Sequence, residues 1–143
     1  MEKTVSTKKA EMLVKDVMLQ AGDFPVLTER VIFKEALEAM SKTRLGIACV
    51  VDKDKHLLGV ITDGDVRRKL LTVQKPFSAF FVDDCIEHCI KSPKVTTPDA
   101  NLISAIELME KYQIWDLPVV NEADELAGLL HLHPAIKAVL GMS

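Results

Sequence analysis

Residues 59–68 read Gly-Val-Ile-Thr-Asp-Gly-Asp-Val-Arg-Arg, a stretch whose side chains are suited to binding chemistry. It combines the hydroxyl of Thr62, the carboxylates of Asp63 and Asp65, and two guanidinium groups. If a helix begins here, its N-terminal N–H groups carry partial positive charge and suit an anion such as phosphate. The carboxylate of Asp65 can accept hydrogen bonds from neighbouring sugar hydroxyls. Together these groups favour a sugar phosphate or a nucleotide as the ligand.

The same residues also have a purely structural interpretation. Aspartate is a favoured N-cap, so Asp63 or Asp65 would then only cap the helix. Arg67 and Arg68 would then be part of a solvated helix face. Asp63 and Asp65 could also form a magnesium pair, but the turn between strand and helix accounts for both as a cap and a sugar clamp.

A strand and a helix must position these groups. The apolar run from Leu57 to Ile61 predicts the strand, and the amphipathic residues through Leu70 predict the helix. Residues 47–51 predict a second, buried strand, joined to the first by the polar turn at 52–55 as a hairpin. Upstream we expect a helical turn at 14–18, a minimal strand at Val26-Leu27, and a helix with the apolar face Phe33, Ala36, Leu37 and Met40.

The second half of the chain repeats the first. Adding 69 to a residue number takes Thr28 to Thr97, Met40 to Met109 and Gly59 to Gly128. Upstream the offset becomes 72 and matches residues 14–18 with 86–90. Each copy is a β-α-β-β-α unit of about 60 residues, which is small for an independent core. We therefore predict an α/β (α+β) protein of two such repeats packed sheet to sheet with pseudo-twofold symmetry.

The composition limits the class of protein. The 143 residues are 48% hydrophobic with a net charge of −3, which is typical of a globular chain able to bury a core. No apolar run approaches the roughly 20 residues of a membrane span, and the polar start is unlike a signal peptide, so we expect a cytoplasmic protein with no membrane partner. No dense Lys/Arg block indicates nucleic acid as a partner. The odd, unpaired cysteines at 49, 85 and 89 predict free thiols.

At this point the chain resembles the CBS-domain pair, or Bateman module. The resemblance rests on the strand Leu117-Pro118-Val119-Val120, on its counterpart at 48–52, and on Gly59 to Asp65, which fits the pattern G-h-h-T-x-x-D. It implies a first repeat at 13–73, an inter-repeat linker at 74–84 and a second repeat at 85–141, preceded by a tail or linker remnant at 1–12. It also implies a disc-like homodimer built on helix faces.

The resemblance further implies an adenosine-type nucleotide in the cleft between the repeats. By match to the motif, Thr62 and Asp65 would hold the phosphate and ribose. The base would lie against four apolar residues: Val26, Ile47, Ala48 and Val60. Asp63 and Arg67 are further ligand-binding candidates, and Arg44 and Arg68 are additional cations near the expected phosphate.

One subgroup is more similar than the rest. The motif Thr-Asp-Gly-Asp-Val-Arg-Arg, with Gly128 to His133 in the second repeat, is similar to the C-terminal CBS pair of sugar-phosphate isomerases of the arabinose 5-phosphate isomerase type. We expect this chain to lack the catalytic sugar isomerase domain of those enzymes and to be either an excised or a stand-alone regulatory module. A similar motif occurs beside sugar nucleotidyltransferase domains. The ligand implied is AMP, ADP, ATP or a CMP-sugar, and we expect no required cofactor.

The second repeat departs from the binding pattern. The offset takes Thr62 to His131 and Asp65 to Pro134, so the hydroxyl and the carboxylate are both missing. We therefore predict one nucleotide site, on the first repeat, with His131 or His133 donating to the ligand's phosphates. The two histidines would lie on one side of an extended segment, but without a third ligand they predict no metal site.

Several other side chains favour structural roles. We expect His56 and His88 to face solvent and Cys85 and Cys89 to pack as small apolar groups. Trp115 is either a packing or dimer contact or a ligand-stacking group. The rings of Phe77, Phe80 and Phe81 are expected to pack across the two repeats or against a partner chain.

No catalytic constellation is evident, so we expect no enzyme activity from this chain itself. The sequence favours a ligand-sensing module that controls an attached or associated sugar-phosphate enzyme. The alternative from another class is a ligand-free dimerisation scaffold.

Overall fold

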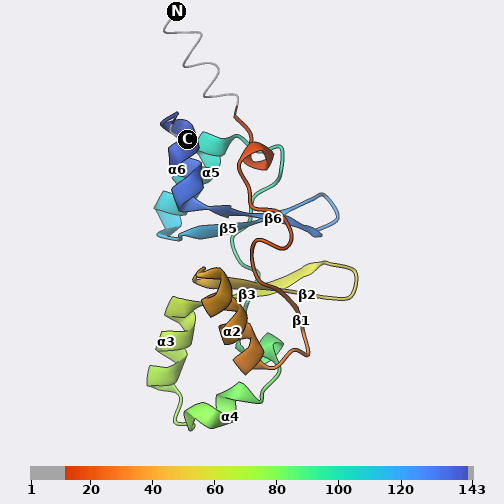
Figure 1. Ribbon diagram of the computed structural model, residues 1–143, viewed down its shortest axis with the longest axis vertical. Coiled ribbons are helices and arrows are strands. Elements are labelled where there is room, and N and C mark those ends of the chain that lie inside the picture. The colour runs from red at the N-terminus through yellow and green to blue at the C-terminus, as the bar shows by residue number, and fades with distance from the viewer. Residues whose placement is uncertain (1–11, 142–143) are drawn as a thin grey trace, which may run out of the picture. The chain divides into compact units, whose positions relative to one another are not determined.

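The computed structural model describes residues 12–141 (Figure 1). The chain divides into two compact units. Among the described residues, one unit contains residues 21–93 and the other combines residues 12–20 with residues 94–141. Helices and strands alternate in both, which confirms the predicted mixed α/β class with two repeats.

The unit of residues 21–93 contains a four-stranded sheet of order β1-β2-β3-β4. Strand β1 runs parallel to β2, while β2 pairs with β3 and β3 with β4 in antiparallel fashion. The hairpin register places Ile47 opposite Thr62 and Ala48 opposite Ile61. The elements are β1 (Val26–Thr28), α2 (Phe33–Thr43), β2 (Ile47–Val51), β3 (Leu57–Thr62), α3 (Asp63–Thr72), α4 (Phe77–Phe81), η2 (Cys85–His88) and β4 (Ile90–Lys91).

The core of this unit forms where α2 packs on the sheet. Phe33, Ala36 and Met40 are buried, as their spacing on one helix face predicted. They contact alternate residues of the central strands, because successive side chains of a strand point to opposite faces. The buried cluster is completed by Ala48, Val50, Ile61, Phe80 and Cys85.

The second unit repeats this plan with fewer strand pairs. Its strands β5 and β6 form an antiparallel hairpin, and an isolated parallel bridge between Thr96 and Val119 stands where the first unit has β1. The offset of 69 recurs in the backbone, since Arg44 and Gln113 both end a helix with positive φ. The elements are η1 (Val14–Asp16), α5 (Leu102–Tyr112), β5 (Asp116–Val120), β6 (Leu126–His131) and α6 (Leu132–Val139).

Each unit takes an edge segment from the start of the other sequence repeat. Residues 90–91 pair with β3, and Leu19 bridges to Leu129 of β6. A glycine permits each approach: a Cβ on Gly59 would lie 2.6 Å from the carbonyl oxygen of Ile90, and a Cβ on Gly128 would lie 2.7 Å from that of Leu19. The motif glycines therefore have a packing role.

The expectations for two aromatic side chains were wrong. His88 was expected to face solvent, but its side chain is 7% exposed and lies beside Phe33 and Phe80. Phe80 was expected to pack across the repeats or against a partner chain, but it is buried in the core of residues 21–93. Both corrections have the same cause: the segment after α3 folds back onto its own unit.

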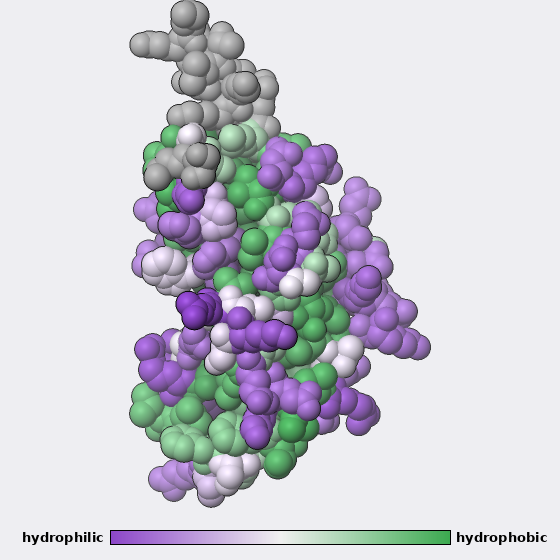
Figure 2. All heavy atoms as spheres, in the orientation of Figure 1, coloured by the Kyte–Doolittle hydropathy of each residue, from purple (hydrophilic) through white to green (hydrophobic). Residues whose placement is uncertain are grey.

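The expectations for the cysteines and for His56 were met. All three cysteines are thiols, as predicted, and two of them are buried. His56 is partly exposed in the hairpin turn, with its Nδ1 3.0 Å from Asp52 Oδ2. None of the helices in residues 12–141 is long and apolar enough to cross a membrane. On the face shown in Figure 2, hydrophilic side chains cover much of the surface and hydrophobic ones emerge between them.

Candidate functional site

The junction of β3 and α3 carries the predicted ligand-binding residues. Thr62 is the N-cap of α3, and its backbone is extended. Its hydroxyl oxygen accepts a hydrogen bond from the backbone N–H of Asp65 at 3.3 Å and donates to Asp65 Oδ2 at 2.6 Å. The capping role therefore belongs to Thr62, with Asp65 as its partner, and the two residues of the motif are in direct contact.

The charged residues of the first turn each have a defined position. Arg68 Nη2 lies 2.5 Å from Asp65 Oδ1, so Arg68, and not Arg67, pairs with the motif carboxylate. The backbone N–H of Asp63 donates to the carbonyl oxygen of Gly46 at 3.0 Å. A Cβ on Gly46 would lie 3.0 Å from Asp63 Oδ2, so the missing side chain leaves room for that carboxylate. Arg67 is exposed.

The four residues expected along the base fall on two faces of the sheet. Ala48 belongs to the core cluster under α2, so its side chain points away from the opposite face. Ile47 and Val60 alternate with core residues along their strands, and they share the opposite face with Thr62. Ile47 is 3% exposed and Val60 is 6% exposed, whereas Val26 is 39% exposed in β1. Only the backbone of Ala48 is available to this face.

The corresponding junction of the second unit is built from different chemistry. His131 is the N-cap of α6, yet its side chain caps nothing. Its Nδ1 lies 2.8 Å from Asp116 Oδ1, and the Asp116 side chain is 8% exposed. Sequence reasoning missed Asp116, although the offset of 69 places it at the position of the buried Ile47 and so marks it as an unusual polar residue.

The expectation that His131 and His133 lie on one side of an extended segment was wrong. Strand β6 ends at His131, and α6 begins at Leu132. His133 is therefore the second residue of a helix, and it is exposed. The change from strand to helix between the two residues removes the period of two on which that expectation rested.

A group of possible metal ligands lies in the hairpin turn between β2 and β3. Asp52, Asp54 and His56 place one ligand atom each within 4.8 Å of one another. The turn itself explains Asp52, because its Oδ1 accepts hydrogen bonds from the backbone N–H groups of Asp54 and His56. In the second unit Asn121 makes the same two bonds, to Ala123 and Glu125. An uncharged amide thus forms the same turn.

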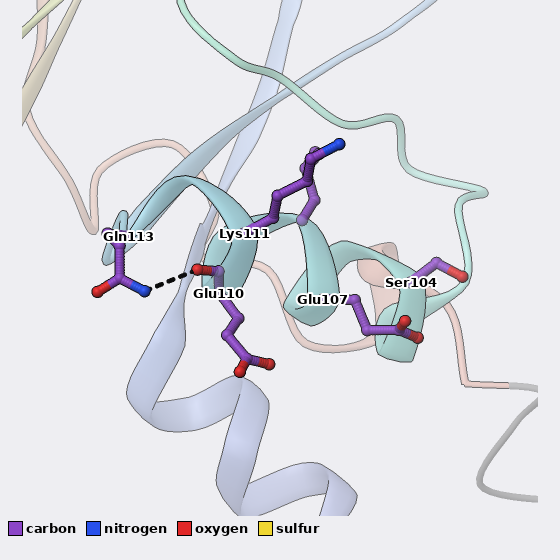
Figure 3. A pocket seen from close by; sticks show the side chains of 6 residues that line it. Ser104, Glu107, Glu110, Lys111 and Gln113 are labelled. Carbon is purple, nitrogen blue, oxygen red and sulfur yellow. Dashed lines mark hydrogen bonds between the residues drawn. The ribbon is translucent and has the colours of Figure 1, made fainter.

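A shallow cavity of about 510 Å³ lies on the outer face of α5 (Figure 3). It contains none of the predicted ligand-binding residues, and the carboxylates of Glu107 and Glu110 at its edge would repel a phosphate. The amide of Gln113 donates to the carbonyl oxygen of Glu110 at 2.9 Å. The lining residues are Ser104, Glu107, Leu108, Glu110, Lys111 and Gln113. This cavity lacks the chemistry of a nucleotide site.

The family model of the CBS domain matches the chain twice, over residues 14–72 and 82–140. The chain belongs to the CBS-domain family. Both matched ranges contain a strand-to-helix junction of the kind described above, so the predicted CBS pair is confirmed. The fold agrees as well: the structure of CBSX2 in complex with AMP superposes with a TM-score of 0.78 at 26% identity, over 90% of this chain and 96% of that one.

Curated relatives of this CBS pair are longer proteins. A Helicobacter pylori (strain J99) protein described as uncharacterized is 35% identical over 132 residues, which are 91% of this chain and 38% of that protein. Arabinose 5-phosphate isomerase KdsD of Francisella tularensis is 28% identical over 137 residues, which are 93% of this chain and 39% of that enzyme. The chain thus spans about two fifths of the length of these relatives.

Proposed function

We propose that this CBS pair is a regulatory module that binds an adenosine-type nucleotide or a nucleotide sugar at the start of α3. The observation that carries the proposal is the contact of Thr62 with Asp65 at that helix N-terminus. It places a hydroxyl, a carboxylate and the positive end of a helix within one turn. Those are the groups that a phosphate and a ribose require.

The face of the sheet that carries Thr62 adds a place for the base. Ile47 and Val60 lie on the same face as Thr62, and Val26 lies at the exposed edge strand. An apolar face beside a polar helix start suits a flat heterocycle attached to a sugar phosphate. The AMP complex of CBSX2, which shares this fold, supports the adenosine class of ligand.

One site is proposed, on the first repeat. At the second junction the side chain of Pro134 has no oxygen to accept a ribose hydrogen bond, and Nδ1 of His131 lies 2.8 Å from Asp116 Oδ1. The offset of 69 therefore relates two junctions of the same shape and different chemistry.

Control of an attached enzyme is the second part of the proposal. This CBS pair covers about two fifths of KdsD, an enzyme that acts on a sugar phosphate. Binding would then shift the enzyme only to the extent that the ligand prefers one conformation of the module. We expect the module to act as a cytoplasmic homodimer through its helix faces, where Leu71 and Leu140, at equivalent positions, are 81% and 61% exposed.

The alternative is a dimerisation scaffold without a ligand. The exposed apolar residues on α3 and α6 favour a ligand-free dimer as much as they favour a dimer that binds a ligand. The two functions differ at Asp65. A scaffold tolerates its replacement, whereas a sensor loses binding.

Thermal unfolding of the purified chain with AMP, ADP, ATP, CMP and CMP-sugars tests the proposal. A ligand at 100 times its Kd stabilises the folded state by about 2.7 kcal/mol, which is readily measured as a higher Tm. We expect Asp65→Ala to abolish the shift. Glu38→Ala is the matched control, because it removes one exposed carboxylate from α2 of the same unit. No shift with any of these compounds would favour the scaffold.

A further inference from the structure

The guanidinium group of Arg68 lies over the start of its own helix. Its Nη2 lies 2.5 Å from Asp65 Oδ1. A Cβ on Gly64 would lie 3.3 Å and 3.4 Å from the two terminal nitrogens of Arg68. Arg68 therefore extends back from the second turn of α3 and covers the backbone of the first turn, where an anion would approach.

This position means that both oxygens of Asp65 already have donors. Thr62 donates to Oδ2 and Arg68 donates to Oδ1. The Asp65 side chain is 25% exposed, so little of the carboxylate is left to solvent. A ribose that donates hydroxyl hydrogens to Asp65 must compete with Arg68 for Oδ1.

The negative charges of the first turn of α3 also affect phosphate binding. Asp63 and Asp65 both lie in the first turn of α3, and their carboxylates oppose the approach of a phosphate. Arg68 has the freedom to compensate, because 63% of its side chain is exposed and its stem is flexible. A guanidinium that leaves a carboxylate for a phosphate keeps a charge-assisted hydrogen bond, and a phosphate can accept two such bonds in a bidentate pair.

We propose that Arg68 exchanges partners on ligand binding and thereby selects phosphorylated nucleotides over neutral nucleosides. The guanidinium leaves Asp65 for the ligand's phosphate, and Asp65 turns to the ribose hydroxyls. A nucleoside without a phosphate displaces Arg68 without offering it a new partner, so it binds more weakly. The inference rests on the proposed function and adds the class of ligand.

The second repeat lacks both members of the Asp65–Arg68 pair. Its equivalents of Asp65 and Arg68 are Pro134 and Lys137, so neither the carboxylate nor the guanidinium is present. Arg67 is the other arginine of the turn, but the carboxylate of Asp65 is paired with Arg68. The exchange therefore belongs to one side chain at one junction.

Calorimetric titration of the whole chain with AMP and with adenosine tests this inference. We expect the unchanged chain to prefer AMP. Arg68→Ala should weaken the affinity for AMP by roughly tenfold, the loss expected for one charge-assisted hydrogen bond. Adenosine should bind as well or better, because Arg68 no longer competes for Asp65. The affinity of Arg68→Lys for AMP should lie between those of the unchanged chain and Arg68→Ala, since lysine keeps the charge and loses the planar guanidinium. Lys34→Ala is the control, because it removes an exposed positive charge at the far end of α2 from Gly46.

The outcomes separate the inference from the function on which it rests. If Arg68→Ala weakens AMP and adenosine equally, Arg68 is only structural and the inference is wrong. An unchanged chain that binds both ligands equally also overturns it, although the binding function stands. If the unchanged chain binds neither AMP nor adenosine and no other nucleotide of the panel, both the proposed function and the role of Arg68 are rejected.

Discussion

His88 Nε2 lies 2.8 Å from Asp83 Oδ2, and the same oxygen lies 2.6 Å from Lys75 Nζ. Because an ionised carboxylate can only accept, both nitrogens donate to it. The His88 ring is packed beside Phe33 and Phe80, with ring centroids 4.8 Å and 5.2 Å away. One carboxylate thus joins Lys75 to His88 within the segment after α3, and the His88 ring contacts Phe33 of the core.

The contribution of the Asp83 carboxylate to the stability of the fold should depend on pH. The hydrogen bond from Lys75, and then the one from His88, lower the pKa of Asp83 below its usual value of 3.8. A carboxylate with a lowered pKa in the folded state stabilises the fold above its unfolded pKa, and this stabilisation is lost as pH falls through the folded value. We therefore expect Asp83→Asn to lower the urea midpoint at pH 7, and the difference from the unchanged chain to shrink below about pH 4.

The control for this pH experiment is Asp54→Asn, which changes an exposed carboxylate in the hairpin turn. Its effect should be small at both pH values. A difference for Asp83→Asn that stays constant from pH 7 to pH 3 would show that the carboxylate charge does not contribute.

The packing of α4 gives a sharper test of the same segment. Phe80 is 1% exposed and Phe77 is 63% exposed, although both lie in one short helix. Phe80→Ala should cost about 3–5 kcal/mol of unfolding free energy, because it leaves a cavity in the core. Phe77→Ala should change the free energy by less than about 0.5 kcal/mol. Denaturant unfolding of the two variants measures both, and equal costs would contradict the position of Phe80.

Much of the fold follows from patterns in the sequence. The helical spacing of Phe33, Ala36 and Met40 predicted the buried face of α2, and the offset of 69 predicted a second copy of each main element. Both patterns are local or periodic. The predictions made from them hold in the structure because each repeat buries its own apolar face. Thr62 and Asp65 were likewise predicted from the motif, and the structure brings them into contact.

The features that the sequence missed depend on contacts between distant residues. The burial of His88 requires the return of residues 77–88 to α2, which no local period signals. The pairing of Asp65 with Arg68 instead of Arg67 depends on side-chain direction in α3, since residues three apart lie on one helix face and residues two apart do not. The burial of Asp116 was only weakly indicated by the sequence, because the offset of 69 places this residue at the position of Ile47.

The glycine of each repeat motif should resist substitution for a packing reason. A Cβ on Gly59 would lie 2.6 Å from both the carbonyl oxygen of Ile90 and the sulfur of Cys89. Because a backbone atom cannot move away cheaply, Gly59→Ala should cost about 1–3 kcal/mol of unfolding free energy. Gly64→Ala is the comparison: its Cβ would meet only the flexible end of Arg68, and alanine favours the helix. Chemical denaturation measures both, and a neutral Gly59→Ala would show that β4 can shift without loss.

The hydroxyl of Thr62 has a structural role that is separable from ligand binding. It accepts the backbone N–H of Asp65 as the N-cap of α3, so Thr62→Ala should lower the unfolding free energy by about 0.5–2 kcal/mol without any ligand. Thr62→Ser keeps the oxygen and should retain most of that stability. If the hydroxyl also contacts phosphate, Thr62→Ala must weaken AMP relative to adenosine, whereas a residue that only caps the helix affects both ligands alike. Denaturant unfolding without ligand, followed by calorimetric titration, separates the two roles: a stability loss with an unchanged AMP-to-adenosine ratio would leave Thr62 as a cap alone.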